Sequence, residues 1–215
     1  MDVEQSTQPG EYETHLTVTL PEGEQTADLC AWAQERGLKF THIVLECGTN
    51  VSQPMLTKHA HGVFADVMRS ADQIRNALTR DGFVVTRVKI EAAPWNAEVP
   101  KSVAEGLAPT PGRYFEHHIK LLLPPTANKE ALVNVAQRYH AHLSRNARKQ
   151  RADNYQERFV TQRCVGVGRG EAHQQLQQLL QHLTPFGYEI LDVEEEFVVY
   201  DSNLQLDAGW IQTTV

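Results

Sequence analysis

One ten-residue pattern occurs twice in this chain and constrains its fold more than any other feature. The two copies are residues 12–21 and 115–124. In each copy an aromatic residue precedes Glu, then any residue, then His, and an apolar run follows that ends in Leu-Pro. The two histidines, His15 and His118, are 118 − 15 = 103 positions apart. The sequence therefore predicts a duplication, with two similar halves of about 100 residues, each long enough to form a small domain.

Other identities recur at nearly the same spacing. Leu29 matches Leu132 at an offset of 103, and Gly82 matches Gly187 at an offset of 105. The offset drifts by single residues at the expected loops, as it does when elements persist and their connections vary.

Hydrophobic periodicity predicts the elements of each half. From Glu13 to Leu20 polar and apolar residues alternate, which is typical of a half-buried strand. Residues 26–36 place apolar side chains at helical spacing, and Gly37 follows where a helix commonly ends. The first half is predicted to contain strands at 13–20, 39–47, 55–61 and 83–92 and helices at 26–36 and 70–80.

This order, β-α-β-β-α-β, is the split βαβ arrangement of ferredoxin-like folds. The second half repeats it, with a polar second strand near 142–149 and a second helix beginning near Glu171. The predicted fold class is α+β, with two tandem ferredoxin-like repeats that have antiparallel sheets and are related by a pseudo-twofold axis. The predicted organisation is a flexible N-terminus (1–10), repeat 1 (11–96), a linker rich in Pro and Gly (97–113), repeat 2 (114–201) and a C-terminal extension (202–215).

Charge and composition exclude several classes of protein. The formal net charge of −7 argues against nucleic-acid binding, which needs a basic surface. Three cysteines without a CxxC pair fit free thiols in a reducing compartment. The acidic first residues do not resemble a signal peptide, and no apolar run approaches the roughly 20 residues of a membrane helix. We expect a cytoplasmic protein with neither a nucleic-acid nor a membrane partner.

Each predicted sheet keeps a polar face after its apolar face meets the helices, because alternate residues of a strand share one face. In the first half this face carries Glu13, His15, Thr17, Thr57, His59, His61, Arg87, Lys89 and Glu91. In the second half it carries Glu116, His118, Lys120, Thr161, Arg163, Asp192, Glu194 and Glu196. The two faces are either solvated, as is common for antiparallel sheets, or turned toward each other around a polar cavity.

His59 and His61 alternate on one predicted strand, and His15 lies on the neighbouring one. Three such imidazoles can converge on a divalent metal such as Zn²⁺, with Glu91 as an oxygen ligand. The sequence thus offers a metal site of His15, His59 and His61, against the alternative of ordinary polar histidines. The second half has Arg163 in place of His59 and cannot build the same site.

The second half indicates an anion instead. His118, Lys120 and Arg163 share its polar face, and the glycine-rich segment 166–170 precedes the second helix. Glycines let backbone N–H groups approach a phosphate or carboxylate at a helix N-terminus, although a flexible helix start explains them equally. We therefore expect a small anionic ligand between the repeats. The expected catalytic residues are His15 and His118, and the expected ligand-binding residues are Glu13, Thr17, Glu91, Glu116, Lys120, Arg163 and Glu196.

The triplet His15-Leu16-Thr17 resembles the HxT signature of 2H phosphoesterases, the family that includes RNA cyclic phosphodiesterases. The resemblance implies two lobes with one His–hydroxyl pair each, in which the histidines activate water or a hydroxyl and the hydroxyl side chains hold the phosphate. The partner triplet here is His118-Ile119-Lys120, so lysine stands where the family has a hydroxyl.

Three functions remain open from the sequence. The first is binding of, or catalysis on, a small anion between the repeats, and the second is a phosphodiesterase similar to the 2H family. The third is a scaffold that forms homo-oligomers through sheet faces or edges. The orientation of His15 and His118 discriminates among them, because the first two functions require both side chains to point into one enclosed cavity.

Overall fold

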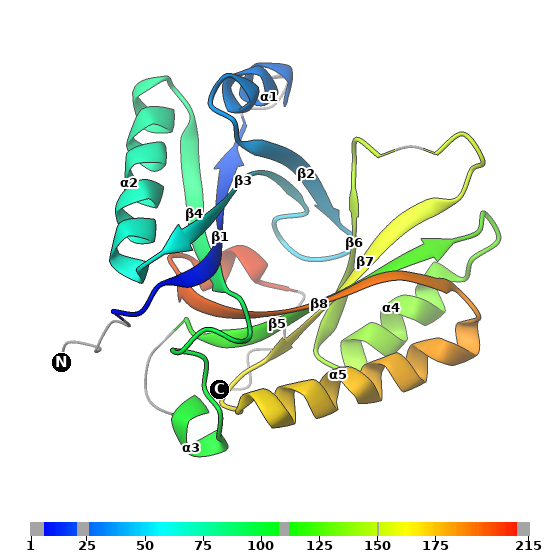
Figure 1. Ribbon diagram of the computed structural model, residues 1–215. Helices are drawn as coiled ribbons and strands as arrows, with labels where there is room; N and C mark the ends of the chain where they lie inside the picture. Colours follow the sequence, from blue (N-terminus) through cyan, green and yellow to red (C-terminus); the bar gives the residue numbers. More distant parts are fainter. Residues whose placement is uncertain (1–6, 21–25, 108–111, 150, 210–215) are drawn as a thin grey trace.

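A computed structural model describes residues 7–20, 26–107, 112–149 and 151–209 (Figure 1). Pro109 and Pro111 of the predicted linker lie outside the described residues, as do Trp210 and Ile211 of the C-terminal extension.

The first half contains four antiparallel strands in the spatial order β4-β1-β3-β2. Its elements are β1 (Gly10–Thr19), α1 (Thr26–Glu35), β2 (Lys39–Leu45), β3 (Ser52–Gly62), α2 (Phe64–Arg80) and β4 (Val84–Ala92).

The second half has the same spatial order, β8-β5-β7-β6. Its elements are β5 (Tyr114–Leu123), α4 (Lys129–Arg138), β6 (Ala141–Asn146), β7 (Gln156–Cys164), α5 (Arg169–Leu183) and β8 (Glu189–Asp201). Three short helices, α3 (Val103–Gly106), η1 (Thr184–Phe186) and η2 (Leu204–Asp207), complete the described chain. The antiparallel α+β class with two ferredoxin-like strand orders is as predicted, while the duplication remains an inference from sequence.

The two sheets join into one closed barrel of eight strands. Strand β2 pairs with β6 through Leu45 and Ser144, and β4 pairs with β8 through Lys89 and Asp201. Each strand of this barrel therefore has two neighbours, and the polar faces look into its interior. Among the described strands the closed barrel leaves no open edge for pairing with a second copy. Homo-oligomerisation through the outer faces of the sheets stays a prediction.

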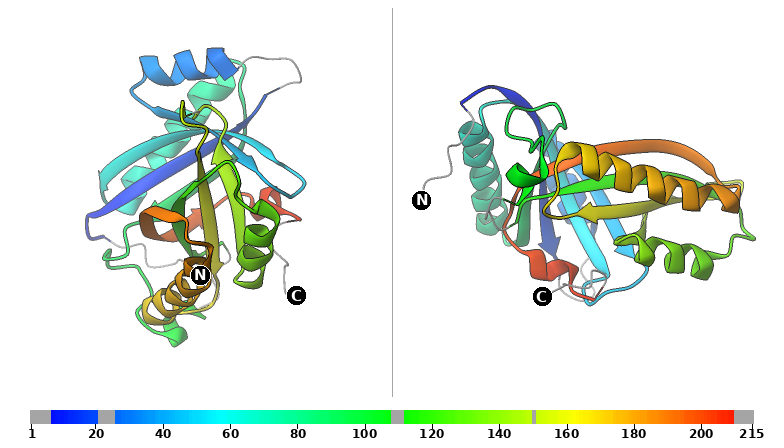
Figure 2. Two further views of the ribbon diagram at one scale, coloured as in Figure 1. Left: turned by 90° about the vertical axis from the view of Figure 1, so that its right-hand side faces the viewer. Right: turned by 90° about the horizontal axis from the view of Figure 1, so that it is seen from below.

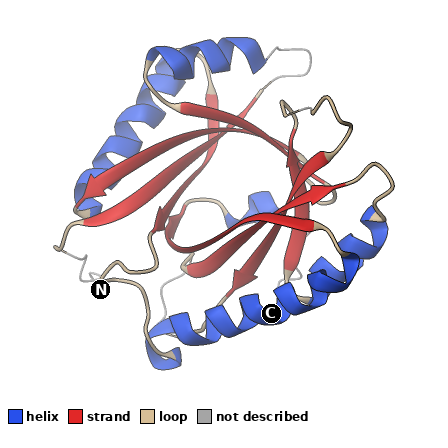
Figure 3. Ribbon diagram, turned by 45° about the vertical axis from the view of Figure 1, so that its right-hand side comes forward, coloured by secondary structure: helices blue, strands red, loops and turns tan. Residues whose placement is uncertain are grey.

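Helices cover the outside of the barrel (Figures 2 and 3). Fully buried apolar side chains point outward from the strands toward the helices, and they form two clusters. The first contains Leu16, Leu56 and Ile90 under α1 and α2, and the second contains Ile119 and Val160 under α4 and α5. Alternation thus sends most apolar side chains outward and most polar side chains inward, although Ile43, Met55 and Phe159 also line the interior.

Several boundaries differ from the predicted ones, and β1 and β3 each begin three residues earlier, at Gly10 and Ser52. Helix α2 begins at Phe64, six residues before the predicted start at Ser70, because Val67 and Ala71 place a buried face one turn earlier. Strand β6 ends at Asn146 and not at Lys149, whose ammonium group instead reaches Glu157 at 3.2 Å.

Candidate functional site

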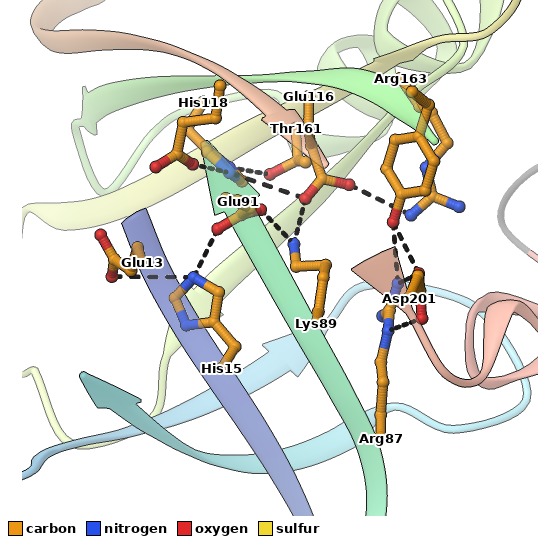
Figure 4. Close-up of polar contacts among 12 residues, drawn as sticks. Glu13, His15, Arg87, Lys89, Glu91, Glu116, His118, Thr161, Arg163 and Asp201 are labelled. Atoms are coloured by element: carbon orange, nitrogen blue, oxygen red, sulfur yellow. Dashed lines mark hydrogen bonds and ion pairs between the residues drawn. The ribbon is translucent and has the colours of Figure 1, made fainter. Parts of the chain in front are cut away.

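His15 and His118 point into the same interior of the barrel (Figure 4). A cavity of about 200 Å³ lies there, and both histidines line it. Its polar lining includes Glu13, His15, Thr17, Thr57, Arg87, Lys89, Glu116, His118, Thr161, Arg163, Glu194 and Glu196. The two polar faces therefore enclose a cavity, which is the second of the two arrangements that the sequence allowed.

The two histidines are held in the same way. His15 Nδ1 lies 2.9 Å from Thr57 Oγ1, and His118 Nδ1 lies 3.0 Å from Thr161 Oγ1. Each threonine is directly opposite its histidine on the neighbouring central strand. These bonds fix both rings and leave each Nε2 directed toward carboxylates.

A glutamate from the last strand of each half meets each Nε2. His15 Nε2 is 2.6 Å from Glu91 Oε2 on β4, and His118 Nε2 is 3.3 Å from Glu196 Oε2 on β8. Two Thr–His–Glu groups are thus built from corresponding strands of the two halves.

Lys89 joins these groups to the rest of the interior. Its ammonium lies 2.6 Å from Glu91 Oε1 and also pairs with Glu116. Burial opposes the ionisation of Glu91, but the charges of Lys89 and His15 outweigh it and lower the pKa of Glu91 to about 2. Burial likewise opposes the charged form of Glu116, whose pKa Lys89 and Arg163 nevertheless hold well below its usual range.

The pKa of His118, unlike those of Glu91 and Glu116, is raised. Burial disfavours the imidazolium, but the hydrogen bond with Glu196 and the charges of Glu196 and Glu116 outweigh it and raise the pKa of His118 to about 9. Burial and the charge of Glu91 raise the pKa of Glu196. His118 is therefore a cation at neutral pH, held by carboxylates.

A second set of charges contains two arginines and two aspartates, and one of its arginines also contacts Glu116. Arg87 binds Asp201 through Nε at 3.0 Å and Asp207 through Nη1 at 3.0 Å, and Arg163 lies 2.7 Å from Asp207 and 3.1 Å from Glu116. Asp207 comes from η2, so the C-terminal extension inserts a carboxylate into the barrel. We refer to Arg87, Arg163, Asp201 and Asp207 as the paired cluster.

The cations predicted to bind an anion do not form one group. Lys120 does not line the cavity, and its ammonium lies 3.0 Å from Glu157. Arg163 belongs to the paired cluster. Thr17, Glu13, Glu116 and Glu196 do line the cavity, whereas Glu91 is buried beside it.

The glycines before α5 have a packing role. A Cβ on Gly168 would lie 2.6 Å from the Ser102 carbonyl carbon, and the N–H of Arg169 donates to the Pro100 carbonyl at 2.9 Å. Gly168 therefore allows the linker to approach, which is a packing role that neither explanation offered by the sequence included.

His59 and His61 do not join His15 at a metal site. Both are exposed at one mouth of the barrel, and His59 Nδ1 lies 3.3 Å from Glu13. Among the described residues, the potential ligand atoms that gather within 4.8 Å of one another belong to Glu91, His118 and Glu196. The sequence placed all three on the polar faces, but the closeness of β4 to β8 depends on barrel closure.

Sequence reasoning missed Asp201, Asp207, Tyr114 and the central place of Lys89. Tyr114 Oη lies 2.8 Å from Asp201 and 3.1 Å from Arg87. Lys89 lies two residues before Glu91 on the same strand face, which was a usable signal. The sequence of helix η2 contains no such signal, because tertiary contacts place this helix against the barrel interior.

Comparison with known proteins gives little information. No family model and no curated protein matches the chain. Among solved structures, a single-residue variant of chlorite dismutase from Candidatus Nitrospira defluvii is 12% identical over 95% of both chains, with a TM-score of 0.28. The same enzyme in complex with imidazole is 10% identical over 92% of this chain and 93% of that chain, with a TM-score of 0.29. Similarity this low carries no argument about ligand or activity.

No helix in the described part of the chain is long and apolar enough to cross a membrane. The resemblance to 2H phosphoesterases gains no support, because Lys120 faces Glu157 and leaves the second triplet without a group on the cavity in the hydroxyl position.

Proposed function

We propose that this protein binds a small positively charged ligand inside its barrel, beside His15 and His118. One observation carries the proposal: carboxylates outnumber permanent cations in the network of ion pairs beside the two histidines. The rest of the cavity lining adds two charges of each sign, from Lys39, Arg145, Glu13 and Glu194, and so leaves this balance unchanged. Five carboxylates, those of Glu91, Glu116, Glu196, Asp201 and Asp207, take part in ion pairs there with three permanent cations, Arg87, Lys89 and Arg163, and with the two histidines. The formal balance is 3 − 5 = −2, and protonated His118 brings it to −1.

The surplus of negative charge lies beside His15 and His118. Arg87 and Arg163 are matched by the two aspartates of the paired cluster. Glu91, in contrast, pairs with His15 and with Lys89, which Glu116 also engages, and Glu196 pairs with His118. Glu13 adds a further carboxylate 3.7 Å from His15 Nε2. Because uncompensated charge inside a protein is costly, a cation bound at this position would relieve the carboxylates.

The same balance disfavours the anion that the sequence indicated. A phosphate near His118 would meet Glu91, Glu116 and Glu196, and the nearest arginines already hold carboxylates. The best-supported ligand class therefore changes from anion to cation.

A ligand panel tests the proposal. Thermal unfolding is measured with guanidinium, short diamines and divalent metal ions, and with phosphate and acetate, all at one ionic strength. A cation at 100 times its Kd should stabilise the fold by about 2.7 kcal/mol and raise the Tm by about 5–10 °C. Phosphate and acetate should have no such effect.

Matched variants locate the site. Glu196→Gln should abolish the cation-dependent shift, while Glu157→Gln should retain it, because Glu157 pairs with Lys120 away from the cavity. Stabilisation by phosphate alone, or an equal loss in both variants, would refute the proposed function.

A further inference from the structure

We propose that Glu91, His118 and Glu196 form a binding site for one divalent transition-metal ion, with Zn²⁺ as the best fit. This inference rests on the proposed function and narrows its ligand class from a cation to a metal. The three side chains come from β4, β5 and β8, so the two halves of the chain share the site. Their ligand atoms already lie within 4.8 Å of one another.

The spacing matches metal coordination. Two ligands with metal bonds of about 2.1 Å and a tetrahedral angle are separated by about 3.4 Å. His118 Nε2 and Glu196 Oε2 are 3.3 Å apart. Glu91 would supply the third ligand atom, which lies within 4.8 Å of the other two, by turning from one of its contacts with His15 and Lys89.

The surrounding residues hold these ligands as a metal site requires. Thr161 Oγ1 lies 3.0 Å from His118 Nδ1, which leaves Nε2 as the coordinating atom. Because a metal-bound imidazole is neutral, metal binding would release the Nε2 proton that faces Glu196. Glu91 is held by His15 at 2.6 Å on one oxygen and by Lys89 at 2.6 Å on the other. Lys89 also pairs with Glu116, so its charge stays compensated if Glu91 turns toward a metal.

Open space adjoins the three ligands, which is an observation independent of the ligand cluster. The cavity of about 200 Å³ reaches His118 and Glu196 from within the barrel. A hollow at the barrel mouth, lined by Glu13, His59, Glu91 and Glu196, reaches the same carboxylates from outside. Water or a substrate atom therefore has room at a fourth coordination position, as in zinc sites that keep one position open.

The donor set selects the metal. One imidazole nitrogen and two carboxylate oxygens suit Zn²⁺, whereas Ca²⁺ takes six to eight oxygen ligands and Mg²⁺ keeps several waters. The proposed ligand set differs from the one that the sequence offered, since it keeps Glu91 and replaces His15, His59 and His61 by His118 and Glu196.

Calorimetric titration of the full chain with ZnCl₂, after chelator treatment and dialysis, tests the site. We expect one strong site per chain, and Co²⁺ in its place should give visible d–d absorption typical of a four- or five-coordinate ion. His118→Gln and Glu196→Gln should each weaken Zn²⁺ binding by about 100-fold or more, and circular dichroism verifies that each variant is folded.

Control variants separate this site from its competitors. His59→Gln combined with His61→Gln removes the exposed imidazoles at the barrel mouth and should leave the strong site unchanged. Loss of Zn²⁺ in that double variant, or retention in both His118→Gln and Glu196→Gln, would overturn the assignment. If guanidinium or a diamine binds in the cavity and Zn²⁺ does not, the metal inference fails and the proposed function stands. If neither binds, both fail.

Discussion

Replacing Lys89 by Met removes the cation that Glu91 and Glu116 share. Lys89 is 9% exposed, and its ammonium lies 2.6 Å from Glu91 Oε1. At an effective dielectric constant of about 20, that contact alone corresponds to about 6 kcal/mol of Coulomb attraction before desolvation is subtracted. Loss of one partner from a buried charge pair typically costs about 3–5 kcal/mol, because the remaining charge is left without compensation. We expect Lys89→Met to lower the free energy of unfolding by that amount at pH 7.

Urea unfolding monitored by circular dichroism measures the loss, and pH identifies its cause. In the wild type the pKa of Glu91 is depressed to about 2, so its stabilising contribution is present above the unfolded value of 4.5 and is lost as the pH falls toward 2. Without Lys89, the burial of Glu91 is opposed by His15 alone among the causes named above, and the pKa of Glu91 should rise above its unfolded value, whereas Arg163 still faces Glu116. The variant should then gain stability as the pH falls from about 7 to about 5, and the difference from wild type should shrink.

Lys120→Met provides the matched control. Lys120 also lies on an inward-facing position of a central strand, but its pair with Glu157 is about one-fifth exposed and its loss should cost only about 0.2–1 kcal/mol. Equal losses in the two variants, or a Lys89→Met deficit that does not change with pH, would refute the reasoning that Lys89 is the electrostatic centre of the interior.

Three further outcomes follow from the structure. The His118 imidazole should titrate near pH 9 by NMR. Because its folded pKa lies above the unfolded value of 6.5, its stabilising contribution is complete below pH 6.5 and is lost as the pH rises through 9. His118→Gln should remove this pH dependence of the free energy of unfolding. Leu16→Ala should lower the free energy of unfolding by about 2–5 kcal/mol in urea, since Leu16 is fully buried under the helices, and a loss below about 1 kcal/mol would contradict the assignment of faces. Gly168→Ala should cost about 1–3 kcal/mol by the same assay, because the added Cβ meets backbone atoms of Ser102, while Gly170→Ala, with open space around it, should be nearly neutral.

The sequence alone predicted the helices and strands, and it predicted which side chains lie on each face of the strands. The alternation of polar and apolar residues around His15 and His118 identifies the side chains that point away from the helices. This alternation depends only on local backbone geometry. It also placed Thr57 and Thr161 on the same faces as the histidines that they bind. The earlier start of α2 escaped prediction because a buried face, and no capping side chain, begins that helix at Phe64.

Barrel closure could not be read from the sequence. A polar strand face looks the same whether it meets water or another polar face, and the pairings that decide between them join β2 to β6 and β4 to β8 across the two halves. Those contacts link Leu45 with Ser144 and Lys89 with Asp201, residues that lie far apart in the chain, so no local pattern records them.

The sign of the ligand charge depends on the same closure. On the polar face of the second half taken alone, Lys120 and Arg163 lie on the same side as His118 and favour an anion. The pairing of β5 with β7 gives Lys120 a partner in Glu157, and helix η2 gives Arg163 a partner in Asp207. Closure then brings Glu91 of the first half against Glu196 and His118 of the second. The sequence of a strand shows which charges lie on one face. Only the assembled barrel determines which of these charges remain uncompensated, and under the proposed function the uncompensated charges are carboxylates.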